Sequence, residues 1–176
     1  MKLIYILRHA DWDSNYGSLT DEGKEKCLKM KNALNKFDFV IASAFERNKM
    51  TASLLTGMES HIDQRAGVLM TTEDQEKKIM ELRKIHPLGV AGAIFSLPEL
   101  HEPVMEAGKR LLSLITETLQ ALPENGKALI VSHDGTMVAA EKIIKKELFS
   151  SLEKTYRELE GFTVDEKLNL EEFNSN

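Results

Sequence analysis

Three short runs of continuously apolar residues most constrain how this chain can fold. In chain order they are Leu3–Leu7, Phe39–Ala42 and Ala128–Val131. Each run is too short to form an isolated helix, and none alternates between apolar and polar residues. Uninterrupted apolar runs of this length are typical of parallel strands that are covered on both faces. The pattern therefore predicts a buried, mostly parallel sheet.

Helical patterns lie between and after these runs. Thr20 can cap a helix whose first turn carries Asp21 and Glu22, where the helix dipole favours negative charge. The buried stripe of this helix is predicted to consist of Cys27, Met30, Leu34 and Phe37. Further helices are predicted near Arg47, after Pro103 and after Gly135. Strands that alternate with helices indicate an α/β fold, with three α/β/α layers around a mostly parallel central sheet.

We expect residues 1–176 to form one domain, because a chain of this length can bury a sizeable core without disulfides or a metal. Residues 57–102 show the least regular pattern, and we interpret them as an insertion or a lid. Near the C-terminus, apolar residues flank the charged stretch 165–167 and predict a terminal hairpin over 162–170.

Charge and cysteine content exclude several classes of function. The formal net charge is -5, whereas general nucleic-acid binding requires clustered Lys and Arg. No apolar stretch approaches the length of a membrane span, and the first apolar run is too short for a signal peptide core. The single cysteine, Cys27, excludes an internal disulfide and suits a reducing compartment. We therefore expect a cytoplasmic protein that binds neither nucleic acid nor membranes.

Charged residues follow each of the three predicted strands. They are Arg8, His9 and Asp11 after the first run, Arg47 after the second, and His133 and Asp134 after the third. In open α/β sheets, ligands bind beyond the carboxyl ends of the strands. Each motif alone is common on protein surfaces, but their coincidence at one ligand-binding edge indicates a functional site.

These side chains fit the chemistry of phosphoryl transfer. An uncharged His9 ring can attack phosphorus and store the group as phosphohistidine, with its other nitrogen held by a backbone carbonyl or a carboxylate. Arg8 and Arg47 offer planar, permanently charged forks that match phosphate oxygens. His133, protonated against the phosphate, would stabilise charge in the transition state. We expect no metal and no cofactor, because the arginines supply the positive charge.

The motifs resemble those of the histidine phosphatase superfamily, also called the phosphoglycerate mutase-like superfamily. Leu7-Arg8-His9-Ala10 resembles its Arg-His-Gly opening, and Leu19-Thr20-Asp21-Glu22-Gly23 resembles the Leu-Thr-x-x-Gly that starts its first helix. Ser43-Ala44-Phe45-Glu46-Arg47, followed by Thr51-Ala52, resembles its Ser-x-x-x-Arg-x-x-x-Thr-Ala segment. Ser132-His133-Asp134-Gly135 resembles its second histidine motif. The resemblance extends from Lys2 to about Ala140.

The resemblance implies a metal-independent phosphatase that forms a phosphohistidine on His9. Asn15 occupies the position where the family often places an asparagine that contacts the phosphate. Ala10 replaces the family's glycine, as it does in short phosphohistidine-phosphatase-like members, and its small side chain leaves room in the pocket. The expected partner is a phosphorylated small molecule or a phosphoprotein. The sequence does not indicate the oligomeric state.

The general acid, which must protonate the leaving oxygen, is the least defined part of the site. In the resembling family it is often a glutamate of the middle segment, and Glu81 is the nearest match. Asp134 follows the second histidine, as the proton donor does in the acid-phosphatase branch, and Asp11 is a third candidate. We favour Glu81 over Asp134. Without an effective acid, substrates with good leaving groups, such as phosphohistidine or acyl phosphates, are favoured.

Three other functions stay open. A phosphate-binding regulatory pseudo-enzyme would keep the arginines but lack an effective acid. A phosphomutase would need additional cations, and the middle segment offers only a scattered set: Arg65, Lys77, Lys78, Arg83 and Lys84. A catalytic metal site would use histidine and carboxylate ligands, namely His9, Asp11, His133 and Asp134. The two arginines at the same edge would repel such a cation.

Overall fold

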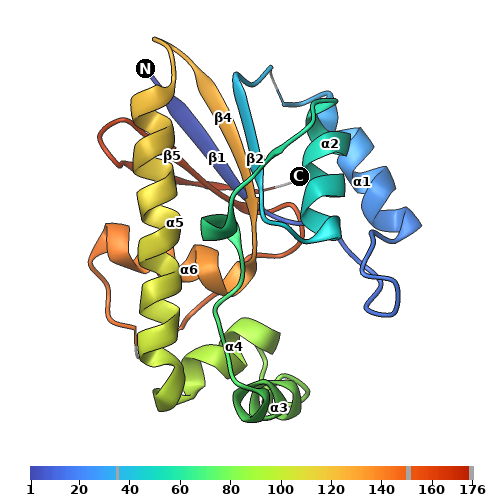
Figure 1. The fold of residues 1–176 in the computed structure, drawn as a ribbon, viewed down its shortest axis with the longest axis vertical. Helices are drawn as coiled ribbons and strands as arrows, with labels where there is room; N and C mark the ends of the chain where they lie inside the picture. The colour runs from blue at the N-terminus through green and yellow to red at the C-terminus, as the bar shows by residue number, and fades with distance from the viewer. Residues whose placement is uncertain (35, 150–151, 175–176) are drawn as a thin grey trace.

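The computed structural model describes residues 1–34, 36–149 and 152–174, which form a six-stranded sheet between layers of helices (Figure 1). The strands are β1 (Leu3–Arg8), β2 (Phe39–Ala42), β3 (His61–Ile62), β4 (Lys127–Ser132), β5 (Gly161–Asp165) and β6 (Leu170–Phe173). The α-helices are α1 (Asp21–Lys31), α2 (Glu46–Thr56), α3 (Glu73–Leu82), α4 (Gly89–Ser96), α5 (His101–Ala121) and α6 (Asp134–Lys145). Two 3-10 turns are η1 (Gln64–Ala66) and η2 (Pro98–Leu100).

The strand order of the sheet is β3-β2-β4-β1-β5-β6. The pairs β2–β3, β2–β4 and β1–β4 are parallel, and β5 pairs with β1 and β6 in the antiparallel direction. The three predicted apolar strands are therefore neighbours at the centre. Their register places Arg8 opposite Ser132 and Ala42 opposite Val131, so their carboxyl ends meet at one edge.

Alternate residues of the central strands face two different hydrophobic clusters. Ile4, Ile6 and Ile130 pack with residues of α5 and α6. Leu7 and Val131 belong to the other cluster, which includes residues of α1 and α2. Figure 1 shows α5 on one side of the sheet and α1 with α2 on the other. This covering of both faces explains why the runs are continuously apolar, and it confirms the predicted three-layer α/β arrangement.

Helix α1 begins where the sequence predicts. The Thr20 hydroxyl accepts a hydrogen bond from the Gly23 N–H at 3.0 Å and caps the helix. A side chain at Gly23 would place its Cβ 2.4 Å from the carbonyl oxygen of Asp11, so only glycine permits this close approach. The helix ends at Lys31, and the predicted stripe continues beyond it through Phe37, which is buried in the same cluster as Cys27.

The middle segment, 57–102, is not irregular as predicted, because it contains β3, both 3-10 turns and the helices α3 and α4. Helix α3 buries only Ile79, so it lacks an apolar stripe that a sequence pattern can reveal. Helix α4 is continuously apolar and begins with Gly89, which gives no helical period. Its stability comes from packing rather than from local sequence. Figure 1 shows α3 and α4 together at one end of the molecule.

The same segment is fixed to the central sheet by two side chains. The Ser132 hydroxyl donates to the carbonyl of Ala66 at 2.8 Å, and the Thr136 hydroxyl donates to the carbonyl of Gly67 at 2.8 Å. The chain that leads into α3 is therefore held against the end of β4 and the start of α6.

The strands β5 and β6 form an antiparallel pair near the C-terminus. Its second strand begins at Leu170, two residues later than the predicted boundary. Leu168 lies in the turn with a φ of 61°, a left-handed conformation that a strand residue does not adopt. No helix within the described ranges combines the length and the apolar character needed to cross a bilayer.

Candidate active site

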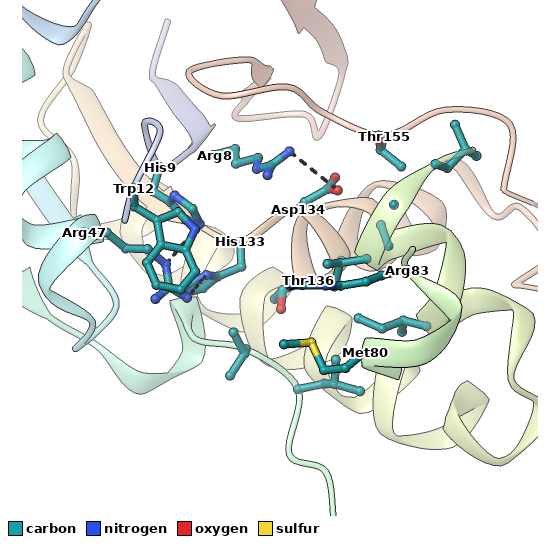
Figure 2. A pocket seen from close by; sticks show the side chains of 18 of the residues that line it. Arg8, His9, Trp12, Arg47, Met80, Arg83, His133, Asp134, Thr136 and Thr155 are labelled. Carbon is teal, nitrogen blue, oxygen red and sulfur yellow. Dashed lines mark hydrogen bonds and ion pairs between the residues drawn. The ribbon is translucent and has the colours of Figure 1, made fainter. Parts of the chain in front are cut away.

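The carboxyl ends of β1 and β4 open into a cavity of about 640 Å³ (Figure 2). Five residues that the sequence singles out line this cavity together: Arg8, His9, Arg47, His133 and Asp134. Trp12 also lines it. The remaining wall comes mainly from the middle segment, including the end of α3 and the start of α4. The parallel register of the sheet therefore brings together side chains that are far apart in the sequence.

His9 follows β1 and is almost completely buried, with 5% of its surface exposed. Its Nδ1 lies 2.8 Å from the carbonyl oxygen of Ala10, and its Nε2 lies 3.2 Å from Nε of Arg47. Since a carbonyl only accepts and a guanidinium only donates, Nδ1 carries the proton and Nε2 carries the lone pair. Burial, followed by the charges of Arg47 and Arg8, lowers the pKa of His9 to about 4. The ring is therefore neutral at neutral pH.

Arg47 lies in the first turn of α2 and contacts both histidines. Its Nη2 lies 3.4 Å from Nδ1 of His133. The guanidinium carbon is 4.2 Å from the ring centroid of Trp12 and 4.5 Å from that of Phe45. Burial lowers the pKa of Arg47, yet an arginine keeps its proton throughout the physiological range. The two aromatic rings hold a permanent positive charge at the cavity wall.

His133 follows β4 and precedes α6. Its Nε2 lies 3.0 Å from the Ser43 hydroxyl. Because Arg47 can only donate to Nδ1, the proton of the neutral ring belongs on Nε2, which donates to Ser43. Burial, followed by electrostatic interactions with His9, Arg47 and Arg8, lowers the pKa of His133 well below its usual value. The His133 ring is therefore neutral in the free protein, and the predicted protonated ring, which requires a bound phosphate, stays a prediction.

Arg8 and Asp134 lie next to each other in the cavity lining, and a dashed line joins them in Figure 2. Nη1 of Arg8 donates to the carbonyl of Tyr156 at 2.6 Å and lies 4.0 Å from Oδ2 of Asp134. Oδ1 of Asp134 accepts a hydrogen bond from the Tyr156 N–H at 2.9 Å. Burial raises the pKa of Asp134 to about 6, although the charge of Arg8 opposes the shift. This carboxyl group can therefore hold a proton in mildly acidic solution.

Three predicted site residues lie elsewhere. Glu81 is exposed on α3 and does not line the cavity, whereas the adjacent Met80 does. Sequence alone does not tell which face of α3 meets the cavity, so the preference for Glu81 over Asp134 is not supported by this geometry. Asn15 is exposed in a turn, where its N–H donates to Asp13. Asp11 accepts a hydrogen bond from the Thr20 hydroxyl at the start of α1.

The geometry also bears on the metal site considered from the sequence. Within residues 1–34, 36–149 and 152–174, no group of three or more His, Cys, Asp or Glu side chains could hold a metal ion. Arg47 is bonded to both His9 and His133, and Asp11 is engaged with α1. The proposed four ligands therefore do not converge.

Ser43 and Thr51 belong to the family-like motifs of the sequence, and the structure shows that both support the site. Ser43 bonds to His133, as described above. The Thr51 hydroxyl accepts a hydrogen bond from the Ala10 N–H at 3.0 Å and donates to the Arg47 carbonyl at 2.7 Å, so it joins the His9 turn to α2. A third, Tyr156, contacts Arg8 and Asp134 through backbone atoms, which no residue type in the sequence could reveal.

Comparison with known families identifies the relationship. The family model described as histidine phosphatase superfamily (branch 1) matches residues 4–150. This chain belongs to the histidine phosphatase superfamily. A comparison with curated protein sequences gave no significant match.

Solved structures share the fold at low sequence identity. A mycobacterial glucosyl-3-phosphoglycerate phosphatase is 17% identical with a TM-score of 0.73, over 97% of this chain and 96% of that one. A phosphoserine phosphatase mutant from Entamoeba histolytica is 14% identical with a TM-score of 0.59, over 93% and 90%. A phosphoglycerate mutase from Bacillus anthracis is 14% identical with a TM-score of 0.66, over 97% and 92%. These similarities establish the fold alone, while family membership supports an enzyme of phosphatase or mutase type.

Proposed function

We propose that this histidine phosphatase hydrolyses phosphate monoesters or protein phosphate without a metal, through a phosphohistidine on His9. The observation that carries the proposal is the state of His9. Its ring is neutral, its Nδ1–H is held by the Ala10 carbonyl, and its Nε2 lone pair lies beside Arg47 in the cavity. A neutral nitrogen nucleophile among permanent cations suits attack on an anionic phosphoryl group.

In the first step, Nε2 of His9 attacks phosphorus and the bond from phosphorus to the leaving oxygen breaks. Asp134 gives its proton to that oxygen, so the alcohol leaves in neutral form. Arg8, Arg47 and His133, whose protonated form the negative charge of the phosphate favours, stabilise the equatorial oxygens. In the second step, water attacks the phosphohistidine and passes a proton to the Asp134 carboxylate. Phosphate leaves, and Nε2 of His9 regains its lone pair.

Asp134 supports a competent enzyme over a phosphate-binding pseudo-enzyme. The pseudo-enzyme was considered because the sequence offers no convincing general acid. Asp134 lines the cavity, lies beside Arg8, and has a pKa of about 6, which is close to the value an efficient proton donor needs.

Three of the five middle-segment cations weighed for a mutase are paired with carboxylates and do not line the cavity, which weakens the case for that reaction. Arg65 is paired with Asp63 and Glu117, at 2.7 and 2.6 Å. Lys78 is paired with Glu99 at 2.7 Å, and Lys77 lies 3.9 Å from Asp74. Of the five cations weighed for a mutase, only Arg83 and Lys84 line the cavity.

The test is hydrolysis of an activated aryl phosphate in the presence of a strong chelator. We expect chelator-resistant turnover by the wild type, a loss of at least about 10³-fold in His9→Ala, and little change in His61→Ala, whose side chain is exposed outside the cavity lining. Acid-quenched enzyme should contain phosphohistidine. Loss of turnover with chelator would favour a metal enzyme, and no turnover by folded wild type would favour the pseudo-enzyme.

A further inference from the structure

The cavity is much larger than a phosphoryl group needs. Its volume of about 640 Å³ lies in the range of small-molecule binding sites. The phosphoryl group would occupy the end beside His9, Arg8 and Arg47. The rest of the cavity must therefore accept the organic part of the substrate, and its lining carries information on what that part is.

Much of this remaining wall is apolar and open to solvent. Val68, Met80 and Val90 are 40%, 48% and 45% exposed, and all three line the cavity. Leu69 and Ile94 also line the cavity and are buried. Apolar side chains left this exposed at a cavity surface are covered favourably by an apolar ligand. This part of the cavity therefore suits hydrocarbon or aromatic groups.

Two cations interrupt this apolar wall. Arg83 is the C-cap residue that follows α3, Lys84 comes next, and both line the cavity. Figure 2 shows Arg83 on the opposite side of the cavity from His9 and Arg47. Among the ion pairs of the described residues, neither has a carboxylate partner, whereas Arg65 and Lys78 of the same segment do. A favourable interaction with the end of the α3 dipole explains a cation at this point of the chain, but it does not require the cation to line the cavity.

The cavity lining carries more positive than negative side chains, which also favours an anionic ligand. It carries Arg8, Arg47, Arg83 and Lys84, whereas Asp134 is its one acidic residue in the part of the chain that the structure describes. This excess of positive charge occurs in a protein with a formal net charge of -5. Arg8 and Arg47 lie beside His9 and serve the phosphoryl group. Arg83 and Lys84 lie apart from it and are left for a second anionic group.

We propose that the substrate is a small phosphate monoester with an apolar body and a second anionic group, and that Arg83 and Lys84 bind this second group. The inference rests on the proposed function for the phosphoryl end. A small molecule is favoured over a phosphoprotein because α3 and α4 extend the wall well beyond the phosphate-binding end, around a space of small-molecule size.

The test compares hexyl phosphate with 6-(phosphonooxy)hexanoate, which share the leaving group and differ by a terminal carboxylate. Binding to the His9→Ala protein is measured by calorimetry, so the result does not depend on turnover. We expect about tenfold tighter binding of the carboxylate compound, and a preference that weakens as salt is added. Hexane-1,6-diyl bisphosphate distinguishes a carboxylate from a second phosphate as the preferred anion.

Variants of Arg83 and Lys84 test whether these two residues cause the tighter binding of the carboxylate compound. In the His9→Ala background, Arg83→Ala with Lys84→Ala should bring the ratio of the two dissociation constants close to one. Lys77→Ala, on α3 but outside the cavity lining, should keep the ratio. A ratio near one before these changes, or a ratio that survives them, would overturn the inference. Stronger binding of a phosphopeptide than of any alkyl phosphate would also overturn it. Absence of turnover by the wild type, with the binding preference intact, would instead count against the proposed function.

Discussion

At the scale of single residues, the site reverses the usual order of two acidities. A histidine ordinarily loses its proton at a higher pH than an aspartic acid does. Here burial and nearby arginines lower the pKa of His9 to about 4, and burial raises the pKa of Asp134 to about 6. Between these values the proposed nucleophile, His9, is neutral while the proposed acid, Asp134, still holds its proton. Two neighbouring groups are thus in opposite working states at the same pH.

This order of pKa values predicts that kcat/KM is highest in acidic solution. The kcat/KM should fall below about pH 4 as His9 gains a proton, and above about pH 6 as Asp134 loses one. Asp134→Asn should abolish the alkaline fall and reduce turnover of alkyl phosphates by about 10²- to 10⁴-fold. Activated aryl phosphates, whose leaving groups need no proton, should lose far less.

The measurement is a pH series of kcat/KM on both substrate types, with Asp74→Asn as the control. Asp74 is exposed on α3 and does not line the cavity. An equal loss on both substrate types would remove Asp134 from the role of proton donor. It would return Glu81 to consideration.

Residue types predicted most of the site but not its finer contacts. Arg8, His9, Arg47, His133 and Asp134 each follow a central strand, and the parallel register brings them into one cavity. Asn15 and Glu81 belong to segments whose orientation depends on tertiary packing, and both are exposed outside it. The neutral state of His133 depends on burial and on neighbouring charges, which a sequence does not contain.

At the scale of elements, the segment between α6 and β5 positions two charged side chains. Tyr156 holds Arg8 through its carbonyl and Asp134 through its N–H. The segment has no regular structure around Tyr156, so its own position depends on that side chain. The Tyr156 ring is 4% exposed in the core, and its hydroxyl donates to the buried carboxylate of Glu141.

Tyr156→Phe should therefore destabilise the protein and disturb the site. Removing the hydroxyl leaves Glu141 with one donor fewer in a buried position, at a cost of about 1–3 kcal/mol. The alkaline limb of the pH profile should also move, because the position of Asp134 relative to Arg8 depends on this segment. Denaturant unfolding and the pH series measure the two effects.

Tyr5→Phe is the matched control for this change. The Tyr5 ring packs edge-on against Phe37 and Phe173, and its hydroxyl has no hydrogen bond to the described part of the chain. Loss of the Tyr5 hydroxyl should leave the free energy of unfolding nearly unchanged. If Tyr156→Phe is equally neutral in stability and leaves the pH profile unchanged, the segment is held by other contacts.

The elements themselves were unequally predictable. The strands β1, β2 and β4 and the cap of α1 follow from short-range patterns, namely continuous apolar runs and Thr20 before two acidic residues. Helix α3 was missed because Ile79 is its one buried residue, although its capping box from Thr72 to Gln75 was present in the sequence. Helix α4 was missed because its apolar residues are continuous rather than periodic.

At the scale of the whole molecule, keeping His9 neutral should cost stability in acid. The unfolded chain binds a proton at an ordinary histidine below about pH 6.5, whereas the folded protein resists protonation down to about pH 4. The unfolded state therefore holds more protons in this window, so the His9 contribution makes stability fall as the pH falls. The raised pKa of Asp134 acts in the opposite direction between about pH 6 and its ordinary value.

His9→Asn isolates the histidine contribution. Asparagine does not titrate, so the variant should gain about 2 kcal/mol relative to wild type when the pH changes from 7.5 to 5. Chemical denaturation of both proteins at the two pH values measures this difference. A constant difference would mean that His9 titrates in the folded protein as it does in water.

The hydrogen bond from Nε of Arg47 to Nε2 of His9 has a consequence for the resting protein. The lone pair that would attack phosphorus is already engaged, so small reactive electrophiles meet a shielded ring. Under the proposed mechanism, the oxygens of an incoming phosphate compete for the same guanidinium, and His9 can attack only after Arg47 leaves this nitrogen. In that mechanism, the substrate itself therefore exposes the nitrogen that attacks it.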